Sequence, residues 1–335
     1  MKPFFLMLMV GLNAVAGPAQ DFCQSELVSS LMVMRADREN SAKEAVLKAH
    51  LQQVLDQQGL DETPFSTLSA LPFDAFQEKV SDYLRALEEP VRAQEFKKEL
   101  LEKLQELIAA QTGDPQSKAE MVKTLLKSEV TSLSRLLKVM ETLPTSSQKY
   151  HQRMLSNACG PDGMARGGIA FEDSGNRHFA FCPGALLLAM LEETEDGISW
   201  RKEMDGEALW FTAFHEMGHV LGANPSSPYR KFYQPLVKCM EKHSAPIASR
   251  YQDEAIADFW GAVGLASMIS DPSISETKAV EIVAKNLAPF RQGSMFSPHH
   301  LPFGARLQVV KLELCRELEK RPLEPEDCRL HLSQP

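Results

Sequence analysis

The strongest constraint on this chain is the run His-Glu-Met-Gly-His at 215–219. On a helix, residues four apart lie on the same face, so His215 and His219 can direct imidazole nitrogens at one metal ion. Glu216 can reach the open side of that ion. There it would take a proton from a metal-bound water, whose pKa zinc lowers from about 15.7 to about 7, as the water attacks a carbonyl. The run therefore requires a helix and predicts zinc-dependent hydrolysis of peptide bonds.

The residues around this run favour a buried helix. The neighbours of the three site residues are all uncharged: Ala213, Phe214, Met217, Gly218, Val220 and Leu221. A helix that surrounds a buried metal needs such neighbours, whereas an exposed helix would carry charges. The alternative is a core helix with two hydrogen-bonded histidines and no metal. The metal site is favoured over it because buried imidazoles without partners are costly.

A catalytic zinc needs a third protein ligand, with its fourth position left for water. The best candidate is Glu254, in the helical segment 251–260. Asp258 lies four residues further on, so one carboxylate can bind the metal while the other accepts a hydrogen bond from the second nitrogen of a ligand histidine. An acidic pair on a helix is more often a solvated face. The apolar neighbours of Asp258, among them Phe259 and Trp260, favour the metal site.

Together these segments resemble the gluzincin branch of the zincin metallopeptidases. In that branch two histidines are followed by a glutamate and, four residues later, by an aspartate; His-Glu-Met-Gly-His and Glu-Ala-Ile-Ala-Asp match this order. The resemblance implies a zinc cofactor bound by His215, His219 and Glu254. It also implies that Glu216 is catalytic and that Asp258 supports a ligand histidine without binding the metal itself.

A third segment, 297–306, is similar to a His-Pro and downstream Arg element of prenyl-protein and periplasmic quality-control metallopeptidases, and exported bacterial metallopeptidases show a comparable order. By this resemblance His300 would be a catalytic residue near the substrate carbonyl, and Arg306 would support the site. Leu301 stands where those families usually have proline, with Pro302 one place later. A surface pair of histidines in a loop is the alternative. The resemblance begins at roughly residue 159 and does not include the preceding residues.

The N-terminus is typical of a secretory signal peptide over residues 1–19. It has Lys2, an apolar stretch at 4–10, and the small residues Ala14 and Ala16 before a cleavage point. No other segment approaches about 20 uninterrupted apolar residues. We therefore expect an exported protein, periplasmic or secreted, without stable membrane insertion.

Cysteine usage supports export. The six cysteines all follow the predicted signal peptide: Cys23, Cys159, Cys182, Cys239, Cys315 and Cys328. An even count in an exported chain indicates disulfides, and the local pairings expected are Cys159 with Cys182 and Cys315 with Cys328. Metal-binding cysteines are the alternative, but no close Cys-x-x-Cys pair supports them.

The charge of the chain bears on its partners. The formal net charge is −9, and no basic cluster is present. A nucleic-acid partner is therefore not expected, nor is binding to anionic lipid. The partner that the motifs predict is a protein or peptide substrate.

The fold class expected is α+β, mainly helical, in two parts. Residues 20–144 are predicted to form an antiparallel helical bundle with a regulatory or binding role. Apolar residues recur there at helical spacing in four stretches: 47–55, 73–87, 100–108 and 122–137.

Residues 150–335 are predicted to form a zincin-like metallopeptidase domain with a small sheet. Its expected elements are a hairpin of strands 168–171 and 178–182, and helices over 185–191 and 208–222. In zincins a sheet edge near the site helix binds extended substrate, so this hairpin is the expected substrate-facing element by analogy.

Two other functions fit the sequence. One is a secreted helical binding or chaperone-like protein with a structural or degenerate zinc site, whose extra ligand would be Asp253, Asp258 or His243. The other is a hydrolase that uses Cys182 as a metal ligand, as in deformylases, which an oxidising compartment disfavours. The residue that stabilises the transition state stays open among His300, Tyr251 and Tyr233.

Overall fold

The structure is a computed structural model of the chain. It describes residues 23, 26–91, 128–133, 137, 140–141, 144–173, 176–221, 234–235, 237–239, 242, 252–288 and 303–319. The longer helices are α2 (Glu26–Gln58), α4 (Phe73–Leu87), α8 (Thr145–Cys159), α10 (Trp210–Leu221), α13 (Gln252–Ile269), α14 (Glu276–Leu287) and α15 (Phe303–Glu319). Shorter helical segments are α3 (Pro64–Leu68), α9 (Pro183–Ala189), η1 (Glu89–Val91) and η2 (Gly206–Leu209). The strands are β1 (Ser128–Ser132), β2 (Gly168–Asp173), β3 (Asn176–Phe181), β4 (Leu191–Thr194) and β5 (Gly197–Trp200). The mainly helical α+β class is confirmed.

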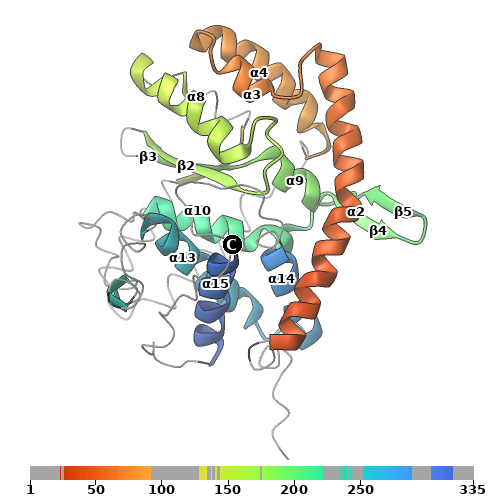
Figure 1. Ribbon diagram of the computed structural model, residues 1–335, viewed down its shortest axis with the longest axis vertical. Helices are drawn as coiled ribbons and strands as arrows, with labels where there is room; N and C mark the ends of the chain where they lie inside the picture. The colour runs from red at the N-terminus through yellow and green to blue at the C-terminus, as the bar shows by residue number, and fades with distance from the viewer. Residues whose placement is uncertain are drawn as a thin grey trace, which may run out of the picture.

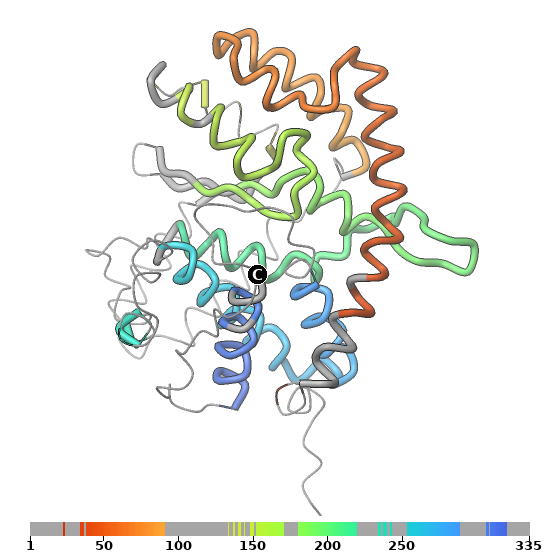
Figure 2. Tube along the Cα trace, viewed as in Figure 1, coloured from red at the N-terminus to blue at the C-terminus, as the bar shows by residue number. Residues whose placement is uncertain are grey.

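Helix α2 runs along one side of the whole molecule (Figure 1). Its 33 residues extend about 50 Å at 1.5 Å per residue. It contacts α14 along part of its length, and α4 and α9 elsewhere. The β4–β5 hairpin projects outward beyond it, as the Cα trace in Figure 2 shows. Because it packs on both ends of the fold, α2 connects the helices around the N-terminal core with those near the C-terminus.

The helical pattern of the first 144 residues is only partly correct. The helices predicted at 47–55 and 73–87 are confirmed as parts of α2 and α4. The helix predicted over 122–137 is wrong at 128–132, which forms strand β1, although Leu133 and Leu137 are helical. Val130 falls at helical spacing from Leu133, yet pairing with β3 overrides that local pattern. The stretch 100–108 lies outside the described residues.

A three-stranded sheet lies between α8 and α10 (Figure 1). Its order is β1-β3-β2, with β1 parallel and β2 antiparallel to β3. The predicted hairpin is confirmed, with Gly168 opposite Phe181 and Asp173 opposite Asn176. The helix expected over 185–191 is confirmed as α9 up to Ala189, but Leu191 begins strand β4. The helix expected over 208–222 is confirmed as α10, which begins at Trp210 directly after η2. Both β2 and β3 contact α10, so the sheet covers one side of the helix that carries the His-Glu-Met-Gly-His run.

Two hydrophobic cores lie on opposite sides of this arrangement. The first, the N-terminal core, contains Phe76 and Tyr83 of α4 together with Leu155 and Leu187, and so includes residues from both sides of the expected boundary at 144–150. The second, the C-terminal core, is formed by α13, α14 and α15 with Phe211 of α10. Among the described helices, none combines the length and apolar character that crossing a bilayer would need.

Two disulfides join cysteines of the described residues. Cys159–Cys182 is confirmed, and it joins the end of α8 to the residue before α9. The expected Cys315–Cys328 bond is wrong, because Cys315 of α15 is bonded to Cys23, 292 residues away. A short loop favours a local pairing in the unfolded chain, but packing in the folded protein places Cys23 beside Cys315 of α15. These bonds are compatible with an exported protein.

Candidate metal centre

Helix α10 is buried on nearly all sides, so its polar residues are held in place by packing. Phe211, Phe214 and Met217 are each at most 4% exposed, and His215 and Glu216 are 6% and 5% exposed. Helix α13 covers one side of α10 and strands β2 and β3 cover another. A polar residue in this position therefore needs a partner from one of those elements.

Glycines allow α10 and α13 to approach closely. A Cβ placed on Gly218 would lie 2.7 Å from the Cα of Ala257, and one placed on Gly264 would lie 2.1 Å from Cγ of Phe214. Both distances are shorter than any ordinary carbon–carbon contact. The small residues thus bring the two helix backbones close enough for a side chain of α13 to reach the histidines of α10.

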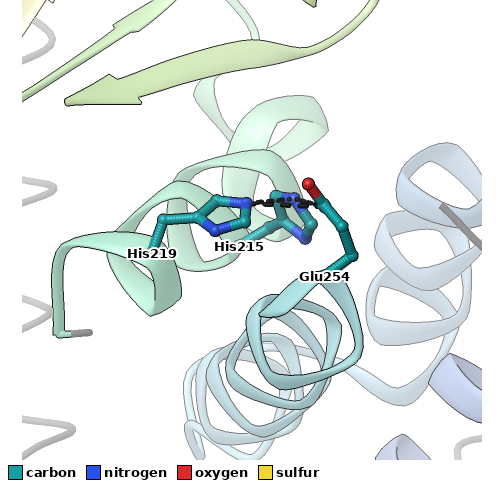
Figure 3. Close-up of side chains that lie close together, drawn as sticks. All are labelled: His215, His219 and Glu254. Atoms are coloured by element: carbon teal, nitrogen blue, oxygen red, sulfur yellow. Dashed lines mark hydrogen bonds and ion pairs between the residues drawn. The ribbon is translucent and has the colours of Figure 1, made fainter. Parts of the chain in front are cut away.

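Three side chains converge at this contact (Figure 3). His215 Nε2 lies 3.2 Å from His219 Nε2, while Oε2 of Glu254 lies 3.3 Å from the first of these nitrogens and 3.5 Å from the second. Donor atoms about 2.0–2.1 Å from a tetrahedral zinc lie about 3.3 Å from one another. The three atoms already have that spacing, and two imidazole nitrogens with one carboxylate oxygen are a donor set that zinc accepts. His215, His219 and Glu254 can therefore hold a metal ion.

Asp258, which pairs with Arg306, fixes the orientation of the His215 ring. Oδ1 of Asp258, 2% exposed, lies 2.9 Å from Nδ1 of His215. Arg306 of α15 donates to both oxygens of Asp258, from Nε at 2.7 Å and from Nη2 at 2.6 Å. An ionised Asp258 accepts the Nδ1 proton, which leaves the Nε2 lone pair directed toward His219 and Glu254.

The charges in this group shift its pKa values. Burial would raise the pKa of Asp258, but the charge of Arg306 and the hydrogen bond from His215 hold it below its ordinary value. Burial would lower the pKa of His215, but its hydrogen bonds with Asp258 and Glu254 outweigh burial and raise that pKa to about 9. A metal ion and a proton therefore compete for the imidazole of His215. Lowering the pH should weaken metal binding.

Glu216 lies beside the metal ligands and against the sheet. A Cβ placed on Gly168 of β2 would be 2.7 Å from Cγ of Glu216, so the carboxylate side chain crosses directly over that strand. Burial raises the pKa of Glu216, against the attraction of His215 and His219. A carboxylate with a raised pKa accepts a proton more readily than an exposed one, as a general base must.

Two of the other residues named as possible metal ligands lie within the described residues, and neither is free to join the three ligand atoms. Asp253 is exposed on α13, away from the three converging ligand atoms. Cys182 is bonded to Cys159, as predicted, and this excludes the disfavoured alternative of a Cys182 metal ligand. The other residues named from the sequence lie outside the described residues: His300, Tyr251, Tyr233 and His243.

Sequence reasoning missed one residue that contacts α10, Asn286 of α14. It is 3% exposed, and its Oδ1 accepts a hydrogen bond from the backbone N–H of Phe211. A signal was present: Asn286 follows Ala279, Ile282 and Val283 at helical spacing, so it is a lone polar residue on a buried face. Such a residue requires a hydrogen-bonding partner.

Comparisons with known proteins do not assign a function to this chain. No protein-family model, no curated protein and no solved structure matches this chain. Any functional assignment therefore depends on the donor set, its spacing and its surroundings.

Proposed function

We propose that this protein is an exported, zinc-dependent peptidase of the gluzincin type. The observation that carries the proposal is the convergence of His215 Nε2, His219 Nε2 and Glu254 Oε2 at tetrahedral spacing, with Glu216 adjacent. Nitrogen donors together with one carboxylate are characteristic of catalytic zinc sites. Zinc bound there would act as a Lewis acid and make a water molecule nucleophilic near neutral pH.

Glu216 would carry the proton through the reaction. It accepts a proton as the oxygen of water attacks the peptide carbonyl carbon, and it returns a proton to the amide nitrogen as the C–N bond breaks. The products are a carboxylate and an amine. Burial raises the pKa of Glu216, and this favours the first step, because the carboxylate then takes up a proton more readily than an exposed one.

Strand β2 is the proposed substrate-facing element. It is a terminal strand of the β1-β3-β2 sheet, and it packs on α10 at Gly168 and Glu216. An extended peptide that paired with the outer edge of β2 would run past Glu216, and its backbone would supply the hydrogen bonds.

The alternative, a secreted binding protein with a structural zinc, needs a fourth protein ligand. Two candidates for it lie within the described residues. Asp258 is engaged with His215 and Arg306, and Asp253 is exposed. Within that part of the chain, the site therefore offers three ligands, as a catalytic zinc requires.

The first experiment measures the zinc content of the purified protein by elemental mass spectrometry. It compares the wild type with the variants His215→Ala and Glu254→Ala. We expect about one zinc per chain in the wild type and loss of zinc in both variants, while Asp253→Ala, an exposed carboxylate on the same helix, retains it. No zinc in the wild type after reconstitution would overturn the metal assignment.

The second experiment separates catalysis from metal binding. Glu216→Gln should retain its zinc but lose hydrolysis of a labelled, unstructured protein substrate by about 10²–10⁴-fold. Equal hydrolysis by Glu216→Gln and the wild type would exclude Glu216 as the base. Hydrolysis by neither, with zinc present in both, would favour the structural site.

A further inference from the structure

The N-terminal end of α10 is held by a side chain from another helix. Phe211, the second residue of α10, donates its backbone N–H to Oδ1 of Asn286 at 2.8 Å. The first N–H groups of a helix have no partner within the helix, so a side-chain oxygen placed there acts as an N-cap. This cap comes from 75 residues along the chain, so it depends on how α14 packs against α10.

Asn286 has no freedom to turn. Its Nδ2 donates to the carbonyl oxygens of Glu207 and Ile282, both at 2.8 Å, and its Oδ1 accepts from Phe211. Exchange of its oxygen and nitrogen would set donor against donor and acceptor against acceptor, so only one orientation of the amide fits. Since the side chain is 3% exposed, water cannot replace these bonds cheaply.

The capped residue contacts a metal ligand. Phe211 lies one helical turn before His215, and the two rings are stacked with centroids 6.0 Å apart and planes at 29°. The Phe211 ring also presses on α13, because a Cβ placed on Gly261 would lie 2.6 Å from its Cε2. A shift of the Phe211 backbone would therefore move a ring that packs on both His215 and α13.

We propose that Asn286 is a positioning residue for the metal centre. By capping α10 at Phe211 it fixes the Phe211 ring, and through that ring it sets the orientation of His215. The inference rests on the proposed zinc function of the site. Two ion pairs from α14, Lys285 with Asp205 and Lys278 with Glu207, hold the same segment from positions closer to solvent.

The test compares Asn286→Leu, which has similar volume and no hydrogen bonds, with Lys278→Met, which breaks the more exposed ion pair to the same segment. Zinc affinity is measured by competition with a chelator, and ligand geometry by the visible spectrum of the cobalt-substituted protein, both well below the unfolding temperature. We expect Asn286→Leu to bind zinc about tenfold more weakly with altered cobalt bands, and Lys278→Met to stay within about twofold of wild type.

Several outcomes would overturn the inference. A folded Asn286→Leu with wild-type zinc affinity and cobalt spectrum would do so while leaving the proposed function intact. A wild type that binds no zinc would overturn both together. If Asn286→Leu does not fold, hydrogen exchange of the wild-type Phe211 amide decides: protection equal to the middle of α10 supports the cap, and exchange as fast as a frayed end overturns it.

Discussion

The N-terminal and C-terminal cores of this protein bury very different groups. The N-terminal core is filled by large side chains, and Phe65, Phe76 and Tyr83 are each fully buried. The C-terminal core borders a linked polar group that includes His215, Asp258 and the partly buried Arg306. Burying such groups costs free energy unless each is paired, so this side of the molecule gives up stability to hold ligand atoms at fixed distances.

The packing of the two regions differs in the same way. Large side chains fill the N-terminal core, whereas Gly218 of α10 lets the backbone of α13 approach at Ala257, and glycines of α13 leave room for Phe211 and Phe214 of α10. A core of large side chains tolerates small shifts of its helices better than a set of ligand atoms does, because ligand bonds require distances within a few tenths of an ångström. Stability and ligand geometry should therefore respond to different substitutions.

The largest expected effect on stability is in the N-terminal core. Phe76→Ala removes a fully buried ring and should lower the free energy of unfolding by about 3–5 kcal/mol. Zinc content of the folded protein should not change, because Phe76 has no part in the metal centre. Denaturant unfolding and elemental analysis of the same preparation check this. Loss of zinc from folded Phe76→Ala would show that the two cores are coupled.

Gly218→Ala should affect both properties. The added Cβ would lie 2.7 Å from the Cα of Ala257, so α10 and α13 must move apart. We expect a loss of about 1–3 kcal/mol in stability, with weaker zinc binding because Glu254 moves away from the histidines. Ser267→Ala, on the exposed side of α13, is the control. A variant that lost stability but kept wild-type zinc affinity would show that helix separation does not set the ligand spacing.

The sequence predicts best what local spacing determines. The i and i+4 spacing identified His215 and His219, and the same spacing suggested that Glu254 and Asp258 act together. Each of these pairs lies within one helical turn, so no tertiary information was needed. Local patterns likewise predicted the helical stretches at 47–55 and 73–87 and the β2–β3 hairpin.

What the sequence could not predict depends on contacts between distant segments. Strand β1 exists because β3 lies beside it, although its apolar spacing continues that of the helical residues after it. Cys315 is bonded to Cys23 because of the path of the chain, and Asn286 reaches Phe211 only once α14 has packed. Arg306 was suggested by a resemblance alone, and its bidentate contact with Asp258 is visible only in the structure.

Asp258→Asn tests the polar group of the metal side directly. The substitution retains an oxygen for the Nδ1 proton of His215 but removes the charge that pairs with Arg306. Changes to groups that orient a metal ligand typically weaken metal binding about 10–100-fold, and we expect a value in that range. Competition with a chelator measures it, with Asp253→Asn as the exposed control. Equal affinity in both variants would mean that the charge of Asp258 does not act on His215.

The smallest expected effect concerns the ion pair between Asp205 and Lys285, whose side chains are 2.9 Å apart. Burial would raise the pKa of Asp205, but the hydrogen bond and charge of Lys285 hold it below the ordinary value of 3.8. The folded protein therefore binds this proton less tightly than the unfolded chain. The pair contributes stability above pH 3.8 and loses it as the pH falls through the lowered folded pKa.

Lys285→Met should accordingly lower the stability of the zinc-free protein at pH 7 by up to about 1 kcal/mol, and the difference from wild type should shrink on acidification. Urea unfolding of both proteins at pH 7 and near pH 3 measures this change. Because the two proteins share every titrating group near the metal ligands, those groups cancel in the comparison. A difference of the same size at both pH values would assign the effect to packing of the aliphatic part of Lys285, and the charge of Asp205 would then have no part in holding the segment that leads into α10.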